Sequence, residues 1–494
     1  MKGFDNEKYI RLQSQNIAER VNKFGGKLYL EFGGKLFDDY HASRVLPGFL
    51  PDTKVEMLSH IKEEVEIVIV INAADIAGNK LRADLGITYE EDVLRLYDEL
   101  TARGLLVGSI VIAQYSSENV AAINFEKRLA GYGVKVYRHY QIEGYPLNVS
   151  HIVSEEGFGK NDYVETSRKV VVVTAPGPGS GKMATCLSQL YHDSKRGIKS
   201  GYAKYETFPV WNLPLNHPVN IAYEAATADL NDVNMIDPWH MQAYGQSAVN
   251  YNRDVEVFPV LNAIFTRLMG TSPYNSPTDM GVNMAGYCIS DDEVCCYAGK
   301  QEVIRRYLNA KTQVRKGKCD ASVVDKLDII MSKLELTEED RRAVVYARTC
   351  AKEHGCVAGA LVTEEGLTAL GKSSALLSCT AAMLLNSLKT LAHLPDVNHI
   401  APLSLEPIQK LKLNSFAEKS VQLHADEALI SLSVSASVNP MAELALEQLP
   451  KLRGSQAHLT AIPSHADEKV LRRLGIQATC DAVFPSKRVY FGQE

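Results

Sequence analysis

Residues 169–190, KVVVVTAPGPGSGKMATCLSQL, constrain the fold of this chain more than any other stretch. A continuous apolar run without helical periodicity leads through a loop of Gly, Pro and Ser into a segment of good helix formers. This order predicts a strand, a tight loop and a helix. The loop amides and the positive end of the helix dipole converge on one point, where Lys182 adds a full charge. The stretch therefore predicts an anion-binding site.

The loop matches the phosphate-binding consensus G-x-x-x-x-G-K-[ST] only in part. Gly181 and Lys182 supply its Gly-Lys pair, but Pro176 stands at the position of the first glycine and Gly177 lies one residue too late. The displaced glycine changes the shape of the loop but leaves its amides and its lysine in place. The sequence predicts that phosphate is held by Gly177, Gly179, Ser180, Gly181 and Lys182.

The last consensus position, which carries a Mg²⁺-binding hydroxyl, is occupied by Met183. Ser180 or Thr185 offers a hydroxyl at a different spacing. The loop thus suggests Mg²⁺ and a nucleotide as cofactors without requiring either. NAD is disfavoured, because the chain lacks G-x-G-x-x-G followed about twenty residues later by an acidic residue.

Before the loop, mostly continuous apolar runs alternate with helical patterns. The predicted strands cover residues 27–32, 65–72, 105–113, 134–140 and 169–174. The predicted helices cover residues 7–22, 53–64, 88–103 and 117–131. This pattern indicates an α/β fold with a mostly parallel, Rossmann-like or P-loop-like sheet and helices on both faces. Ligands of such sheets bind beyond the carboxyl ends of the strands, where the glycine loop lies.

Residues 199–259 are rich in Pro, Asn, aromatic residues and isolated charges. Irregular stretches of this length are typically functional or disordered, and the aromatic content argues against disorder. We expect packed loops that cover the carboxyl edge of the sheet. Each polar residue alone is better explained by a structural ion pair, but as a set they indicate a site. The set comprises Lys204, Glu206, His217, Glu224, Asp229, Asp232, Asp237, His240, Arg253 and Asp279.

The chain of 494 residues is too long for one hydrophobic core. We predict an α/β domain over residues 1–290 that contains the anion loop and its covering loops. A helical connector is predicted over 291–355, and a smaller α/β domain over 356–494.

The C-terminal region again alternates between strand-like and helical patterns. A hairpin is predicted at Glu365 and Gly366, a long buried helix over 375–394 and a strand over 428–437. The tetrapeptide His-Ala-Asp-Glu occurs at 424–427 and again at 465–468. Its His-x-x-Glu spacing suggests metal chemistry, but capping of a helix start explains the acidic residues better.

The composition excludes several partners. The net charge is −6 with no long run of like charges, which argues against nucleic acid and anionic membranes. The N-terminal residues contain no apolar signal region and no apolar run approaches a membrane span, so we expect a cytoplasmic protein. Nine scattered cysteines suit reduced thiols. Cys350, His354 and Cys356 lack the second ligand pair typical of zinc sites.

Two resemblances add to this interpretation. Residues 169–206 resemble P-loop enzymes of the dethiobiotin synthetase and CTP synthase type, in which a lysine after the second strand also faces phosphate; Lys204 takes that place here. The segments EFGGKLFDDYHASRVLPGF, TAPGPGSGKMATC, SGYAKYETFPVWNLPLNHPVN and AYEAATADLNDVNMIDP resemble a bacterial family of about this length, catalogued as a domain of unknown function. That second resemblance covers nearly the whole chain and implies no activity.

The first functional hypothesis is an enzyme that binds a nucleotide or a phosphorylated small molecule and transfers or ligates a phosphoryl group. Lys204 would stabilise developing charge, Asp229 or Asp237 would act in catalysis, and Asp232 would bind Mg²⁺. A transferase or isomerase that acts on a phosphorylated metabolite without ATP is the alternative. A third hypothesis is a non-catalytic assembly or regulatory protein, with Tyr202, Tyr205, Phe208 and Trp211 in a subunit interface. Homo-oligomerisation stays open.

Overall fold

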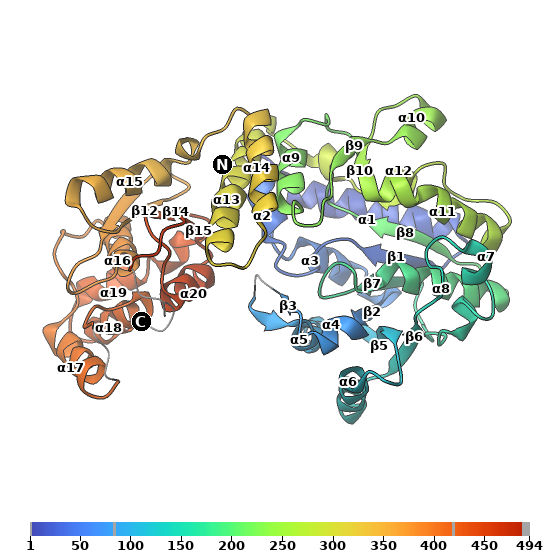
Figure 1. Cartoon of the computed structure of the whole chain (residues 1–494), viewed down its shortest axis with the longest axis horizontal. Helices are drawn as coiled ribbons and strands as arrows, with labels where there is room; N and C mark the ends of the chain where they lie inside the picture. Colours follow the sequence, from blue (N-terminus) through green and yellow to red (C-terminus); the bar gives the residue numbers. More distant parts are fainter. Residues whose placement is uncertain (1, 83–84, 417–419, 487–494) are drawn as a thin grey trace. The chain divides into compact units, whose positions relative to one another are not determined.

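The computed structural model describes residues 2–82, 85–416 and 420–486. The chain divides into two compact units, coloured along the sequence in Figure 1. The larger unit comprises residues 2–224 and 231–298, and the smaller comprises 225–230 and the chain from 299 onward. No helix of the described residues has the length and apolar character needed to cross a membrane.

The larger unit is built on a seven-stranded sheet in the order β11-β8-β1-β7-β2-β5-β6. All of its strand pairs are parallel, which confirms the predicted parallel sheet. Figure 1 labels β8, β1, β7, β2 and β5 in this order down the sheet. The strands are β1 (Leu28–Phe32), β2 (Val65–Asn72), β5 (Leu106–Tyr115), β6 (Val136–Tyr140), β7 (Val170–Thr174), β8 (Gly201–Tyr205) and β11 (Gly281–Val282).

Helices precede and follow these strands. From the N-terminus to β11 they are α1 (Asn6–Lys23), α2 (Tyr40–Val45), α3 (Thr53–His60), α4 (Ala73–Ala77), α5 (Tyr89–Ala102), α6 (Val120–Gly131), α7 (Val149–Ile152), α8 (Lys182–Lys195), α9 (Pro218–Ala226), α10 (Pro238–Tyr244), α11 (Asn252–Met269) and α12 (Pro277–Met280). α5 begins with a capping box, since Thr88 and Glu91 accept hydrogen bonds from each other's backbone amides.

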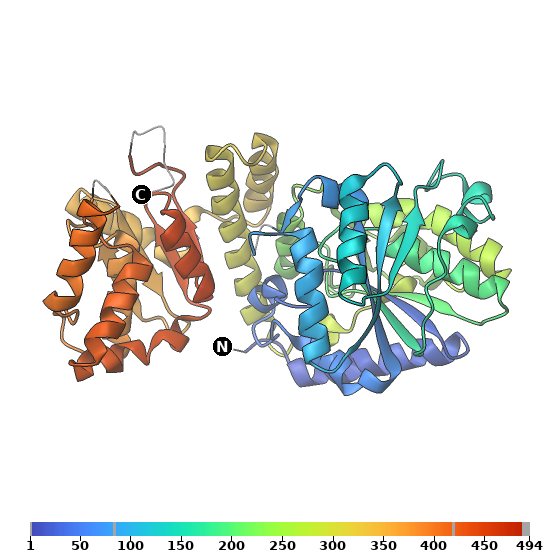
Figure 2. The same ribbon diagram turned by 90° about the horizontal axis from the view of Figure 1, so that it is seen from below.

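Both faces of the large sheet are covered by helices. On one face Tyr29, Val171 and Tyr202 pack in a single apolar cluster with Leu187 of α8 and Phe265 of α11. On the other face α5 packs against β2 and β5. Figure 2 shows the strands between the blue helix α5 and the green helices α8 and α11. Burial on both faces explains why the strands read as continuous apolar runs.

The direction of the chain through the sheet reverses at β7. The chain passes from β2 outward through β5 to β6, returns to β7 in the centre, and then continues to β8 on the other side of β1. Neighbouring strands whose connections leave in opposite directions open a crevice at their carboxyl ends, where ligands of such sheets bind. The glycine loop follows β7 and therefore lies at this crevice.

Residues 199–259 are more regular than the expected packed loops. They contain β8, the helices α9 and α10, and an antiparallel pair formed by β9 (Asn234–Ile236) and β10 (Val249–Tyr251). The region also does not end at Pro259, because α11 runs through this residue. Pro259 cannot donate the backbone hydrogen bond of a regular helix. The apolar face of α11 packs into the main core, and this packing offsets the loss of that bond.

The smaller unit contains a four-stranded mixed sheet in the order β13-β12-β14-β15. Its strands are β12 (Ala358–Val362), β13 (Thr368–Lys372), β14 (Gln456–Leu459) and β15 (Gln477–Cys480). α13 (Asp292–Arg315) starts in the larger unit and enters the smaller one at residue 299. The further helices of the smaller unit are α14 (Ala321–Lys333), α15 (Arg342–His354), α16 (Cys379–Leu391), α17 (Pro402–Asn414), α18 (Ala425–Ala436), α19 (Pro440–Leu446) and α20 (His465–Arg473). β12 and β13 form the predicted hairpin, with Gly366 at positive φ in its turn.

The predicted strand over residues 428–437 is wrong, because residues 428–436 lie within α18 and Ser437 is its C-cap. The amide of His424 donates to the Glu427 carboxylate at 2.8 Å and starts the helix. Ser431 and Ser435 are buried, and each hydroxyl donates to the carbonyl four residues earlier at 2.7 Å. These bonds satisfy buried serines inside a helix and override the strand-like alternation. The second His-Ala-Asp-Glu segment also begins a helix, α20, as predicted.

Candidate functional site

The glycine loop, residues 175–181, connects the central strand β7 to α8. Gly181 has φ 96°, and a Cβ there would lie 2.8 Å from the Cβ of Ala113, so this position requires glycine. At Gly177 an added Cβ would lie 2.1 Å from the hydroxyl oxygen of Tyr89. The Tyr89 side chain therefore lies directly against the loop backbone. Neighbouring elements fix the loop in one shape.

The start of α8 offers backbone amides to a ligand. Gly181 is its N-cap, and no side chain caps this helix. α5 and α6 differ, because Thr88 and Asn119 accept hydrogen bonds from their first-turn amides. The first amides of a helix have no acceptor within the helix and carry its positive dipole end. At α8 these donors stay available at the glycine loop.

Lys182 adds a poorly compensated charge at the same point. Its ammonium group lies 3.5 Å from the Gly177 carbonyl, a long contact for a charged donor. Burial lowers the pKa of Lys182, the Glu31 carboxylate opposes this shift, and the cations Lys204 and Arg253 add to it. A desolvated cation with two cationic neighbours attracts an anionic ligand.

Lys204 lies in β8 and has the opposite surroundings. Its ammonium group contacts Glu206 at 2.8 Å and forms an ion pair with Asp254 at the start of α11. Burial alone would lower the pKa of Lys204, but the carboxylates of Asp254, Glu206 and Glu31 raise it above its usual value. Burial also raises the pKa of Glu206 from 4.5 to about 7, against the opposing effect of Lys204. The charge of Lys204 is thus compensated by carboxylates of the protein itself.

Glu31 of β1 belongs to this site, and the sequence analysis missed it. Its carboxylate is buried and accepts a hydrogen bond from the Tyr202 hydroxyl at 2.6 Å. Both Lys182 and Lys204 experience its charge. One signal could have revealed it: Glu31 is the only acidic residue in the apolar strand KLYLEF. A carboxylate in a strand buried on both faces requires a cationic or hydrogen-bonding partner.

The three predicted aspartates do not gather at the glycine loop as functional groups. Asp237 is fully buried, and its two oxygens accept hydrogen bonds from the amides of Trp239 and His240 and from the amide and hydroxyl of Thr278. It therefore joins α10 to α12.

The other two aspartates are engaged or placed elsewhere. Asp232 is buried and accepts a hydrogen bond from Arg253 at 2.8 Å, which takes up its charge. Asp229 is exposed in the turn after α9 and belongs to the short segment 225–230 of the smaller unit. Asp232 is therefore engaged in an ion pair and does not offer a free carboxylate to the loop.

The glycine loop also lacks the hydroxyl that Mg²⁺ uses at a phosphate loop. Ser180 donates to the Gly177 carbonyl at 2.8 Å, and the Thr185 hydroxyl contacts Nδ1 of His139 at 3.4 Å. Met183 packs against the apolar core. The hydroxyls of both predicted substitutes donate within the fold, and Met183 leaves the consensus Mg²⁺ position without a hydroxyl.

Among the described residues, one group has the spacing of metal ligands: His217, Asp292 and Cys296, whose ligand atoms lie within 4.8 Å of one another. The Nε2 atom of His217 lies 3.0 Å from Asp292. Its Nδ1 atom accepts a hydrogen bond from the amide of Val219 and is therefore unprotonated. Metal-binding histidines normally donate through their second nitrogen. The neutral His217 ring thus carries its proton on Nε2, and the group acts as a hydrogen-bonded helix cap.

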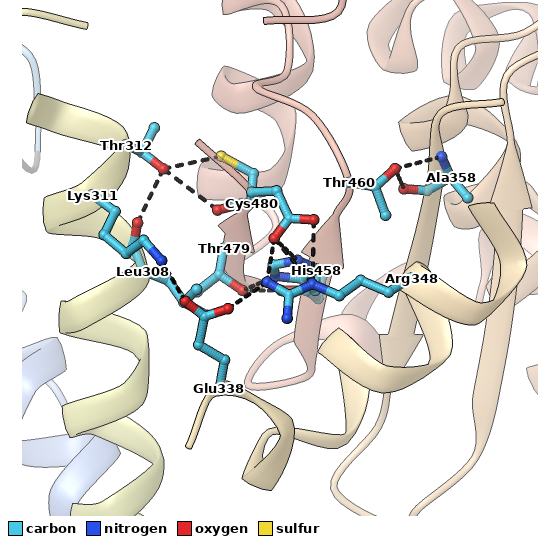
Figure 3. A network of polar contacts seen from close by, with 12 residues as sticks. Leu308, Lys311, Thr312, Glu338, Arg348, Ala358, His458, Thr460, Thr479 and Cys480 are labelled. Atoms are coloured by element: carbon cyan, nitrogen blue, oxygen red, sulfur yellow. Dashed lines mark hydrogen bonds and ion pairs between the residues drawn. The ribbon is translucent and has the colours of Figure 1, made fainter. Parts of the chain in front are cut away.

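The smaller unit contains a denser polar network, shown in Figure 3. Arg348 forms ion pairs with Glu338 and Asp481, and Glu338 also contacts Lys311 at 2.6 Å. Asp481 lies 3.3 Å from Nε2 of the buried His458. Burial raises the pKa of Asp481, but hydrogen bonds from His458 and Arg348 outweigh it and hold that pKa below its usual value. Every charge has a partner, so this network is structural.

The fold and the loop together define a doubly wound α/β protein with a glycine-rich loop at its topological reversal. The chain belongs to the DUF1846 family, described as a domain of unknown function: residues 2–335 match its N-terminal domain and 339–490 its C-terminal domain. This confirms the second resemblance. A UPF0371 protein of Corynebacterium efficiens is 54% identical over 489 residues, 99% of each chain. UPF0371 proteins of Corynebacterium urealyticum and Streptococcus equi subsp. zooepidemicus are 57% identical over 88% and 52% identical over 99% of each chain.

Proposed function

We propose that this protein is an enzyme that binds a phosphorylated small molecule or nucleotide at the glycine loop. The observation that carries the proposal is Lys182, a half-buried cation at the uncapped start of α8 whose ammonium group has one long contact, 3.5 Å to the Gly177 carbonyl. Phosphate oxygens would accept hydrogen bonds from the α8 amides, and their negative charge would offset the desolvation of the ammonium group.

Within this proposal the two lysines have different roles. Lys182 contacts the bound phosphate. Lys204 holds Glu206 and Asp254 in place and contributes its field, since it is close enough to affect the pKa of Lys182. Phosphoryl transfer is compatible with such parts, because it depends mainly on positioning and on charge stabilisation.

The alternative enzyme class acts on a phosphorylated metabolite without ATP. One observation favours it: Asp232, the residue predicted to bind Mg²⁺, is paired with Arg253. Nucleotide phosphates normally bind together with Mg²⁺. The third hypothesis loses its main support, because Tyr202, Tyr205 and Phe208 are buried within the larger unit.

Isothermal titration calorimetry tests the proposal with ATP, ADP, glucose 6-phosphate and pyrophosphate, each with and without Mg²⁺. We expect at least one of these ligands to bind, and Lys182→Met to weaken it about tenfold or more. Lys195→Met is the matched control, since it removes the same charge from the opposite end of α8. The proposal fails if Lys182→Met and Lys195→Met bind every ligand equally well.

Dependence on Mg²⁺ separates the two enzyme classes. Binding of ATP that requires Mg²⁺ would support nucleotide-dependent transfer. Preference for glucose 6-phosphate without any effect of Mg²⁺ would support the ATP-independent class.

A further inference from the structure

A cavity of about 210 Å³ lies in the larger unit beside the carboxyl end of β8. Its walls come from α1, β10, α10, α12, β11 and the segment after β8. The residues that carry the argument are Asn16, Arg20, Glu206, Trp211, His240 and Asp279. At about 30 Å³ per water molecule, the volume corresponds to about seven waters, comparable to a monosaccharide.

Several polar atoms of the cavity lining can accept or donate a further hydrogen bond. The Oδ1 atom of Asn16 is buried and has no hydrogen-bond partner in the described part of the chain. His240 uses Nδ1 for Ser276 at 3.0 Å, and Nε2 has no partner among residues 2–82, 85–416 and 420–486. Asp279 accepts a hydrogen bond from Tyr244 through one oxygen, and its other oxygen lies 3.8 Å from the His240 ring. The cavity therefore presents an unsatisfied acceptor beside polar groups with spare capacity.

The charges of the lining indicate what such a ligand carries. Glu206 and Asp279 are acidic, and Arg20 is the one basic residue of the lining that is always charged. Arg20 also donates to the Gly281 carbonyl at 3.1 Å. The amide oxygen of Asn16 and the carboxylates of Glu206 and Asp279 thus offer acceptors to a ligand, and a buried acceptor without a partner is costly. A ligand with hydroxyl or ammonium groups removes that cost.

The cavity is connected to the glycine loop through one ion pair. Glu206 lines the cavity and contacts Lys204 at 2.8 Å. Lys204 in turn affects the pKa of Lys182 at the loop. A ligand that bonds Glu206 therefore acts on the electrostatics of the phosphate site.

We propose that this cavity binds a small molecule of monosaccharide size with several hydroxyl or ammonium groups, as the second substrate of the enzyme. Its role as second substrate rests on the proposed function, whereas ligand binding in the cavity does not. Asn16, Glu206 and Asp279 accept its hydrogen bonds, and Trp211 forms an apolar wall.

Tryptophan fluorescence measures this binding directly. The chain has two tryptophans, Trp211 and Trp239, so Trp239→Phe leaves Trp211 as the reporter of the cavity. Glucosamine, glucose and glucuronate serve as probes with ammonium, hydroxyl and carboxylate groups. We expect a saturable change with glucosamine and glucose, and weaker or no binding of glucuronate. Absence of saturation with all three probes, or tightest binding of glucuronate, overturns the proposal.

Variants of the lining test the assignment of the contacts. Asn16→Leu removes an unsatisfied acceptor and is expected to fold normally while weakening glucosamine about tenfold or more. Glu206→Gln, which leaves Lys204 paired with Asp254, should weaken it by a similar factor. Gln15→Leu, at an exposed position of the same helix, is the control. Equal affinity of all three variants would contradict the assignment.

Lys182→Met separates this inference from the proposed function. Normal glucosamine binding by that variant, with no phosphate ligand bound by any form, retains the cavity and removes the proposed function. Phosphate binding without a fluorescence response to any probe would retain the proposed function and remove the cavity inference.

Discussion

Lys182 follows β7 and Lys204 lies in β8, and these two strands flank β1 on either side. The two lysines nevertheless have opposite electrostatic surroundings. Lys204 lies among Glu206, Asp254 and Glu31, and the pKa of its ammonium group is raised. Lys182 has one long contact to a carbonyl, and its pKa is lowered. A compensated cation stabilises the fold, and an uncompensated cation is available to a ligand. Two lysines of similar appearance in the sequence therefore have opposite electrostatic surroundings.

The largest expected effect is on stability after Lys204→Met. This substitution leaves buried carboxylates without their counter-ion, which typically costs about 3–5 kcal/mol. Urea unfolding followed by circular dichroism measures the loss. Lys182→Met should change the free energy of unfolding by no more than about 1 kcal/mol, because its charge has little compensation to lose. Equal losses in the two variants would remove the distinction between the lysines.

The next effect concerns the shape of the glycine loop. Gly181→Ala combines a positive φ with a Cβ 2.8 Å from Ala113 and should cost about 3 kcal/mol. Gly179 also has positive φ, 76°, but a Cβ there meets no atom of the described residues within 4 Å. Gly179→Ala should therefore cost only about 1 kcal/mol. Thermal unfolding of both variants tests whether the loop is held as tightly as the contacts indicate.

The Lys204 region should also respond to pH through Glu206. Its pKa rises from 4.5 to about 7 on folding, mainly by burial, with Asp254 and Glu31 adding to the shift and Lys204 opposing it. Between these two pH values the folded state binds more protons than the unfolded state, so the free energy of unfolding falls as pH rises. Glu206→Gln should lose this component. Urea titrations of both proteins at about pH 5, 6 and 7, within the window between the two pKa values, measure this component.

The result that would contradict this prediction is a parallel pH dependence of the wild-type protein and Glu206→Gln. It would mean that Glu206 stays ionised beside Lys204 across the whole window, and the Lys204 cluster would then be fully charged.

The smallest effect is expected for Ser180→Ala. The variant loses one hydrogen bond to the Gly177 carbonyl, worth about 1 kcal/mol. Phosphate binding should be nearly unchanged, since the Ser180 hydroxyl points into the loop and the amide remains. A strong loss of phosphate affinity without loss of stability would show that the hydroxyl serves the ligand directly.

The site could be predicted from the sequence only where its parts are local. The strand, loop and helix of 169–190 and the position of Lys182 follow from neighbouring residues, and the structure has them as expected. Glu31 and Asp254 were missed because their partner Lys204 is distant in sequence: the pairing of β1 with β8 sets Glu31 opposite Lys204, and α11 supplies Asp254. Asp232 and Asp237 were chosen for their residue type, which does not distinguish a cap or an ion pair from a ligand.

Local sequence determined the glycine loop, the parallel strands and the helix starts, because backbone geometry and burial patterns act over a few residues. The sequence also indicated the family, because long segments are shared with its members. Only the tertiary structure decided which lysine keeps a free charge, which aspartates are already used and that 428–436 is helical. The physical reason is that charge compensation and burial depend on residues from different strands and helices, and no local pattern specifies how these meet.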